Sequence, residues 1–233
     1  MRNVILASSS IIQGSGYLEY LQPELKELFK GVSKVLFIPY ARPSGISFDT
    51  YTEIVKKGFC FMGIEVNGIH SFDNPKLAIE DAEAIFVGGG NTFVLVSKLY
   101  EQNIMEVLKM KIENGTPYLG TSAGSNICGV SMQTTNDMPI LMPPCFETLN
   151  IIPYNINAHF IAANKQSTHK GETRETRIKE YHAFNKTPVI GLKEGSWLRI
   201  LENEIILKGS LQAYLFEKDK EIRICQPKTI FQE

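Results

Sequence analysis

Residues 83–129 read EAIFVGGGNTFVLVSKLYEQNIMEVLKMKIENGTPYLGTSAGSNICG, and they decide the fold because they contain two strand–glycine–helix units in succession. The first unit runs from an apolar stretch at 83–89 into a segment of helical period at 92–99, and the second from 117–122 into 123–129. Neither apolar stretch alternates with polar residues, which is typical of strands covered on both faces. Such units favour a parallel sheet with crossover helices.

The same rhythm extends outward from this region. Further apolar stretches predict strands at 3–8, 34–41 and 64–70, and helical periods fall at 17–30, 48–62 and 101–114. Beyond residue 130 the rhythm loosens, a charged helix is expected at 170–184, and the remaining segments read as strands and hairpins. We therefore predict a doubly wound, mostly parallel sheet with helices on both faces and a C-terminal antiparallel extension. With no linker or repeat in sight, residues 1–233 are expected to form a single catalytic domain.

Composition narrows the class of protein. Hydrophobic residues make up 43% of the 233 residues, and the formal net charge is -1, which gives no electrostatic basis for binding nucleic acid or an anionic membrane. No apolar run reaches the roughly 18 to 20 residues of a membrane helix. The four cysteines include no C-x-x-C pair, so neither a zinc site nor a disulfide framework is indicated. A soluble cytoplasmic protein without a metal is expected.

Two glycine-rich segments follow predicted strands, and both should lie at the carboxyl edge of the sheet, where ligands bind in such folds. One of them, VGGGNTF at 87–93, lacks the Lys-Ser/Thr of a P-loop. Its glycine N–H groups could cradle a phosphate. An oxyanion element fits better, with Asn91 or Thr92 capping the next helix, and phosphate binding is the second interpretation.

The other segment contains Gly-Thr-Ser-Ala-Gly at 120–124, which fits the nucleophile-elbow pattern G-x-S-x-G. In that pattern the flanking glycines relieve crowding, so the serine can occupy a strained strand-to-helix turn with its hydroxyl in the crevice. The alternative is a tight turn in which Ser122 merely caps the helix.

A serine nucleophile needs a base, and the chain has four histidines. His159 is the best candidate, because it lies in IPYNINAHF (152–160), where a strand end could face a pocket. His169, in an expected loop, is the next best, whereas His70 and His182 are adequately explained by solvated positions.

A base needs an orienting acid. Asp137 lies in TTNDMPI (134–140), between the serine and the histidine in the chain and within an otherwise uncharged stretch from 115 to 146. It is either a buried acid with a designated partner or an Asx-turn residue.

Seven segments occur in an order and at spacings that resemble one family: FIPYA (37–41), VGGGNTF (87–93), GTSAG (120–124), TTNDMPI (134–140), INAHF (156–160), HKGETRE (169–175) and VIGLKEGSW (189–197). Together they are similar to the peptidase E family, the alpha-aspartyl dipeptidases, over nearly the whole chain. The resemblance implies a fold related to class I glutamine amidotransferases, with serine in place of cysteine.

The resemblance also implies roles for individual residues. Ser122 would be the nucleophile, His159 the base and Asp137 the orienting acid, and the N–H groups of Gly90 and Ala123 would form the oxyanion hole. The implied reaction is hydrolysis of dipeptides with an N-terminal aspartate, without a cofactor, by a monomer or small homo-oligomer.

Substrate binding would fall to Arg174, as the cation that grips the aspartyl side chain, with Asn91 as a further contact. An arginine offers a carboxylate a bidentate fork. The residues alone favour a solvated helix face for Arg174, because Glu172, Glu175 and Arg177 surround it.

Two departures from the family bear on specificity: Thr121 stands where close members carry tryptophan, and the segment after INAHF is one residue longer. A related peptidase of different specificity, similar to cyanophycinase, is therefore an alternative. An α/β-hydrolase esterase fits less well, since His159 follows Ser122 too closely in the chain. The remaining alternative, from another class, is a non-catalytic binding module on the same fold.

Overall fold

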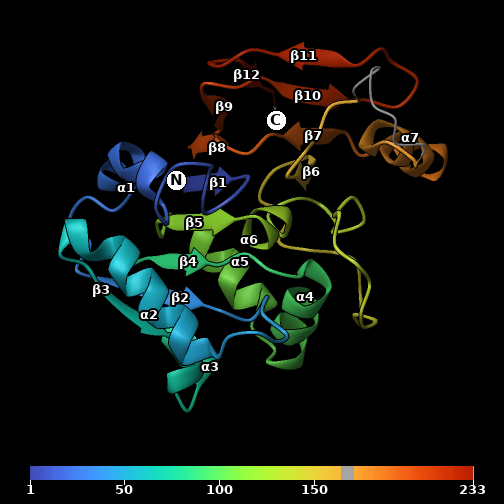
Figure 1. The fold of residues 1–233 in the computed structure, drawn as a ribbon. Coiled ribbons are helices and arrows are strands. Elements are labelled where there is room, and N and C mark those ends of the chain that lie inside the picture. Colours follow the sequence, from blue (N-terminus) through green and yellow to red (C-terminus); the bar gives the residue numbers. More distant parts are fainter. Residues whose placement is uncertain (164–170, 233) are drawn as a thin grey trace.

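The structure, a computed structural model, describes residues 1–163 and 171–232, which form two sheets flanked by helices (Figure 1). The large sheet has eight strands in the order β12-β9-β8-β1-β5-β4-β2-β3. In chain order these are β1 (Asn3–Ala7), β2 (Lys34–Ile38), β3 (Glu65–Gly68), β4 (Ile85–Val87), β5 (Tyr118–Thr121), β8 (Ser196–Leu201), β9 (Glu204–Gly209) and β12 (Ile230–Phe231).

The smaller sheet has four strands in the order β11-β10-β7-β6. They are β6 (Asn155–Ala158), β7 (Val189–Leu192), β10 (Ala213–Phe216) and β11 (Arg223–Cys225). The seven α-helices of the described residues are α1 (Gln22–Leu28), α2 (Phe48–Phe59), α3 (Pro75–Glu80), α4 (Thr92–Glu101), α5 (Met105–Glu113), α6 (Ala123–Asn126) and α7 (Arg174–Phe184).

Strand directions confirm the predicted fold class. β1, β5, β4, β2 and β3 are mutually parallel, whereas β8, β9 and β12 extend the same sheet with antiparallel pairs. The second sheet is mixed, because β6 and β7 are parallel and β10 and β11 are antiparallel additions. Its existence as a separate sheet was not predicted, since short strands at the end of a chain do not reveal which sheet they join.

The parallel strands bury both faces because successive side chains point to opposite sides of a sheet. In β1, Val4 and Leu6 belong to one hydrophobic cluster, and Ile5 and Ala7 belong to another. Helices α1 and α2 pack on the face of Ile5, whereas α3, α4 and α5 contribute to the cluster on the face of Leu6. This division explains why these strands read as continuous apolar runs.

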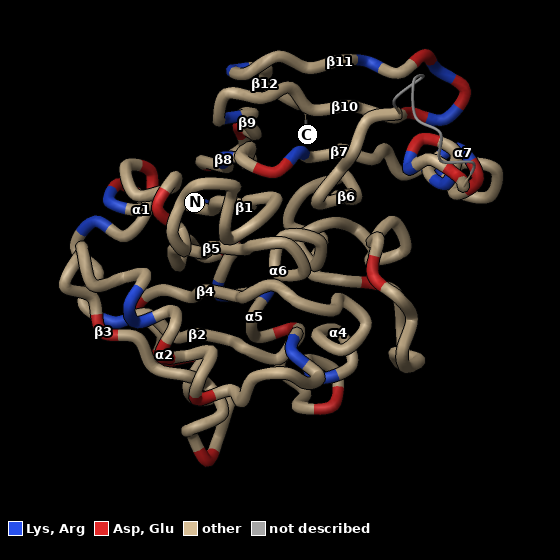
Figure 2. The backbone as a smooth tube through the Cα atoms, in the orientation of Figure 1, with Lys and Arg blue, Asp and Glu red and all other residues tan. Residues whose placement is uncertain are grey.

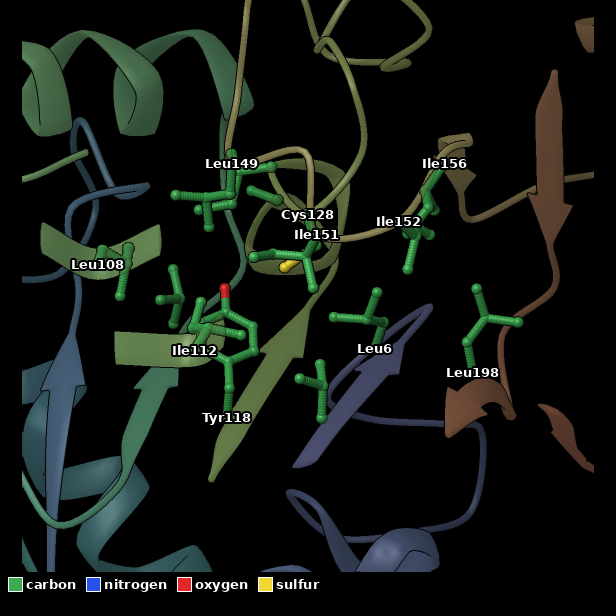
Figure 3. Packing of buried hydrophobic residues seen from close by; sticks show 14 of the residues in the cluster. Leu6, Leu108, Ile112, Tyr118, Cys128, Leu149, Ile151, Ile152, Ile156 and Leu198 are labelled. Carbon is green, nitrogen blue, oxygen red and sulfur yellow. The ribbon is translucent and has the colours of Figure 1, made fainter. Parts of the chain in front are cut away.

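The cluster on the Leu6 face also receives the segment that precedes β6. Figure 3 shows Leu149, Ile151 and Ile152 packed close to Leu6 and Tyr118. All five side chains are almost completely buried. This packing holds the chain between the two sheets in place, and it thereby positions β6 relative to β5.

Helix boundaries differ from the predictions by a few residues at several ends, and two differences are larger. The predicted helix at 17–30 is a 3₁₀ helix (Glu19–Leu21) followed by the short α1, and α3 was not predicted. The start of α3 is nevertheless marked in the sequence, because Asn74 caps it by accepting hydrogen bonds from the N–H groups of Lys76 and Leu77, with Pro75 at the first position.

Charged residues lie mainly on the helices and outer loops, and α7 carries both signs (Figure 2). Within the described ranges, no helix combines the length and apolar character that crossing a membrane requires.

Candidate active site

Ser122 lies between β5 and α6 in a conformation that non-glycine residues rarely adopt, with φ 54° and ψ -111°. The flanking glycines permit this turn. A Cβ on Gly120 would lie 2.4 Å from the carbonyl oxygen of Gly124, and a Cβ on Gly124 would lie 2.1 Å from that of Val87. The Ser122 side chain makes no capping hydrogen bond to α6, so the capping alternative does not describe this residue.

His159 follows β6 and meets the serine, with 2.8 Å between its Nε2 and Oγ of Ser122. Its backbone is held in place, because its N–H donates to Oγ of Ser8 (2.9 Å), whose hydroxyl donates to the carbonyl oxygen of Leu192 (2.7 Å). The contact between Nε2 of His159 and Oγ of Ser122 is the hydrogen bond through which an imidazole can deprotonate a serine hydroxyl.

Glu194 follows β7 and provides the carboxylate for the histidine. Because β6 and β7 are parallel and pair Ala158 with Leu192, the residues just beyond these two ends lie side by side. The Oε1 atom of Glu194 is 2.6 Å from Nδ1 of His159. The pair is open to solvent, with the histidine side chain 38% and the glutamate side chain 56% exposed. Ser122, His159 and Glu194 thus form a continuous hydrogen-bonded series.

Asp137 was predicted to orient His159, and the observed geometry differs. Its Oδ2 atom accepts hydrogen bonds from the N–H (2.7 Å) and the hydroxyl of Thr92 and from the hydroxyl of Thr135 (2.9 Å). The Asp137 carboxylate is bound at the N-terminus of α4, where negative charge is favoured. Its Oδ1 atom accepts no hydrogen bond from the described residues, and Asp137 lines the cavity beside the serine.

The loop after β4 lies against the serine elbow. Gly90 has φ +149°, and a Cβ there would lie 2.2 Å from the carbonyl oxygen of Ala41, which accepts the N–H of Asn91 (2.7 Å). Within the described residues, the N–H of Gly90 has no hydrogen-bond partner. The N–H of Ala123, at the first position of α6, has none within its helix. Both predicted oxyanion donors therefore remain available.

Asn91 uses its side chain within the protein. Its Oδ1 accepts the N–H of Val94 (3.2 Å) as the N-cap of α4, and its Nδ2 donates to the carbonyl oxygen of Met138 (2.8 Å). Asn91 was predicted to contact substrate. In the observed geometry its side chain ties α4 to the segment that carries Asp137.

Arg174 is the first residue of α7, and it forms no ion pair with a described residue. Burial is the main cause that lowers the pKa of its guanidinium, followed by the nearby Arg177, whereas Asp137 and Glu194 raise it. These influences indicate a half-buried cation within electrostatic range of Asp137 and Glu194, the two carboxylates that line the cavity. The solvated ion pair here joins Arg177 of α7 to Glu172, which precedes the helix, with 3.7 Å between Nε and Oε2.

The remaining histidine candidates do not enter the site. His169 lies outside the described residues. The ring of His182 lies 3.0 Å from the carbonyl oxygen of Thr187, and that of His70 lies 2.9 Å from Asp49.

These groups surround a cavity of about 340 Å³. Its lining residues are Ser9, Ser10, Ile11, Arg42, Gly89, Gly90, Ser122, Asp137, His159 and Glu194. A larger cavity of about 420 Å³ beside α3 contains no nucleophile paired with a base. Among the described residues, no three His, Cys, Asp or Glu side chains are grouped to hold a metal ion.

Comparison with known proteins identifies the family. Residues 4–208 match the sequence profile of Peptidase family S51. The chain belongs to this family. It is 43% identical to Peptidase E of Streptomyces coelicolor over 216 aligned residues. The alignment covers 93% of this chain and 88% of that protein. It is also 43% identical over 221 residues to a probable alpha-aspartyl dipeptidase of Drosophila melanogaster, an alignment that covers 94% of this chain and 91% of that protein.

Solved structures agree on the fold of this S51 peptidase. A peptidase from an acI-B1 Actinobacterium matches with a TM-score of 0.75 at 17% identity, over 100% of this chain and 97% of that one. A putative peptidase E protein from Listeria monocytogenes matches with a TM-score of 0.67 at 23% identity, over 90% and 98%. The predicted resemblance to the peptidase E family is confirmed.

Sequence reasoning missed Glu194 as the partner of the histidine. A signal was present, because Glu194 lies in VIGLKEGSW, directly after a predicted strand. Strand ends in α/β sheets carry ligand-binding groups. Asp137 stood out instead because its neighbours are uncharged.

Proposed function

We propose that this S51 peptidase hydrolyses dipeptides with an N-terminal aspartate, Asp-X, through an acyl-enzyme on Ser122. The observation that carries the proposal is the 2.8 Å contact between Oγ of Ser122 and Nε2 of His159, made by a serine held at φ 54°. The proposal includes a cytoplasmic monomer or small homo-oligomer that needs no cofactor.

In the acylation step, Oγ of Ser122 attacks the scissile carbonyl carbon while Nε2 of His159 takes its proton. Glu194, hydrogen-bonded to Nδ1, orients the ring and stabilises the imidazolium. The imidazolium then protonates the leaving amine as the peptide bond breaks. Water repeats the sequence on the ester and releases aspartate. A base of this kind contributes roughly 10² to 10⁴ in rate.

The oxyanion of each tetrahedral intermediate would lie between the N–H groups of Gly90 and Ala123. Losing one such donor typically reduces the rate by about 10² to 10³. The close packing of Gly90 against Ala41 supports this role, because the donor is fixed before substrate binds.

We assign recognition of the substrate's N-terminal aspartate to two side chains of opposite charge, Arg174 and Asp137. Arg174 has no ion-pair partner among the described residues and would bind the aspartyl carboxylate. The free Oδ1 of Asp137 would accept the N-terminal ammonium, in place of the orienting role first predicted for this residue. Each charge-assisted hydrogen bond contributes about 1.5–3 kcal/mol, which distinguishes aspartate from neutral side chains.

The test is hydrolysis of Asp-Leu, Asn-Leu, Glu-Leu and Asp-Leu-Leu by the wild type, Ser122→Ala and Ser97→Ala. Ser97 is a matched control, because its buried hydroxyl has no hydrogen-bond partner in the part of the chain that the structure describes. We expect cleavage of Asp-Leu only, abolished by Ser122→Ala and kept by Ser97→Ala. Unchanged activity of Ser122→Ala would contradict the mechanism, and equal cleavage of Asn-Leu would contradict the role of Arg174.

A further inference from the structure

We propose that Arg42 binds the C-terminal carboxylate of the substrate and thereby restricts hydrolysis to peptides that end one residue beyond the scissile bond. This inference rests on the proposed Asp-X hydrolysis at Ser122. It concerns the second residue of the dipeptide, for which none of the roles assigned above provides a contact.

Arg42 follows β2 at the carboxyl edge of the large sheet and lines the catalytic cavity. The Cζ atom of its guanidinium lies 5.1 Å from the ring centroid of Tyr51, within the range of a cation–π interaction. Tyr51 is buried, and its hydroxyl donates to the carbonyl oxygen of Gly89 (3.2 Å). The exposed guanidinium of Arg42 thus packs on a buried ring whose hydroxyl is hydrogen-bonded to Gly89, the neighbour of the proposed oxyanion donor Gly90.

The backbone beside Arg42 is joined to the same loop. The carbonyl oxygen of Ala41 accepts the N–H of Asn91 (2.7 Å), and it lies so close to Gly90 that no Cβ would fit there. The backbone of Arg42 is therefore anchored one residue away from the contact that fixes Gly90. Consecutive residues of a peptide are about 3.8 Å apart between Cα atoms, so a carboxylate one residue beyond the scissile carbonyl is within reach of a long arginine side chain.

The charges at the site favour this assignment over the alternatives. Arg42 is the only cation among the described residues that line the cavity, and it forms no ion pair with any described residue. Arg174 does not line the cavity and is near enough to Asp137 and Glu194 for both carboxylates to raise the pKa of its guanidinium. An Asp-X dipeptide carries its ammonium and side-chain carboxylate on the first residue, which suits Asp137 and Arg174. The remaining carboxylate, on the second residue, is left for Arg42.

A second observation points to a ligand in the same cavity. Ser9, which also lines it, is 4% exposed, and its Oγ atom has no hydrogen-bond partner among the described residues. A buried hydroxyl without a partner is uncommon in folded proteins, and a bound carboxylate or peptide group would provide one.

The experiment compares Asp-Leu with Asp-Leu amide, which differs only in lacking the C-terminal charge, by measuring kcat/KM for release of leucine or leucinamide. The enzymes are the wild type, Arg42→Gln, Arg42→Lys and Lys26→Gln. Lys26 is a matched control, because it is an exposed cation over an aromatic ring, 5.9 Å from the centroid of Phe61, outside the cavity.

We expect the wild type to prefer Asp-Leu over its amide by about 10- to 150-fold, the range of one charge-assisted hydrogen bond. Arg42→Gln should lose that factor on Asp-Leu and keep wild-type activity on the amide, which also shows that the variant folds. Arg42→Lys should recover only part of the preference, because lysine lacks the bidentate fork. Lys26→Gln should behave as the wild type.

Equal loss on both substrates in Arg42→Gln would overturn the inference, because Arg42 would then act on the first residue or on the fold. No loss on either would overturn it as well. A wild type that cleaves neither substrate would refute the proposed Asp-X hydrolysis itself, which is a different result from either of these.

Discussion

Replacing Glu194 with glutamine tests which carboxylate serves the catalytic histidine. The substitution keeps the size of the side chain but removes the charge 2.6 Å from Nδ1 of His159. The neutral amide stabilises the imidazolium of the transition state less well than a carboxylate. The hydrogen bond from Oγ of Ser122 to Nε2 stays in place, so the loss should appear in kcat rather than in KM.

The expected magnitude follows from the exposure of the pair. A hydrogen bond to a charged group contributes about 1.5–3 kcal/mol. The side chains are 38% and 56% exposed, so solvent screens the charge and the lower part of that range applies. We therefore expect kcat for Asp-Leu to fall about 10- to 30-fold, which corresponds to about 1.5–2 kcal/mol.

The assay pairs hydrolysis with labelling of the serine by a fluorophosphonate, which carries no ammonium group. Glu194→Gln should slow both hydrolysis and labelling. The comparison variant Asp137→Asn should raise KM for Asp-Leu and leave labelling nearly unchanged, because the proposed partner of Asp137 is the substrate ammonium. Slower labelling in Asp137→Asn together with normal labelling in Glu194→Gln would refute this division of roles.

Three further predictions concern the elements around the site. Gly90→Ala should reduce kcat about 10²- to 10³-fold, because its Cβ would lie 2.2 Å from the carbonyl oxygen of Ala41 and displace an oxyanion donor; steady-state kinetics with Asp-Leu measures this. Thr173→Ala should reduce the free energy of unfolding by about 1 kcal/mol in urea titrations, since the Thr173 hydroxyl caps α7 by accepting the N–H of Thr176 (3.1 Å). Burial raises the pKa of the Cys128 thiol to about 12. The stability that this shift contributes is complete below the unfolded-state pKa of about 8.5 and is lost as pH rises from there towards about 12. In urea titrations, the free energy of unfolding should therefore fall less between about pH 8 and pH 11 in Cys128→Ala than in the wild type.

The parts of the fold that follow from local pattern could be read from the sequence. The parallel strands of the large sheet are continuous apolar runs because both faces are covered, and the elbow at Ser122 carries its glycines because Val87 and Gly124 leave no room for side chains. Both signals are contained within a few consecutive residues.

The position of the acid could not be read in this way. The contact between His159 and Glu194 depends on the parallel pairing of β6 with β7, and α7 lies between these two strands in the chain. Asp137 is conspicuous in the sequence, yet its Oδ2 is bound to Thr92, which is distant in the chain. Arg42 was missed for a similar reason, since only the folded sheet brings the end of β2 beside the elbow.

The central claim is that the hydroxyl of Ser122 is the nucleophile, and the most direct measurement is the mass of the protein after reaction with diisopropyl fluorophosphate, with the site located by peptide mapping. The account predicts one adduct per chain, on Ser122, formed at a rate that falls when Asp-Leu is present. Loss of activity with the adduct on another residue, or full hydrolysis of Asp-Leu by protein carrying the adduct on Ser122, would contradict it.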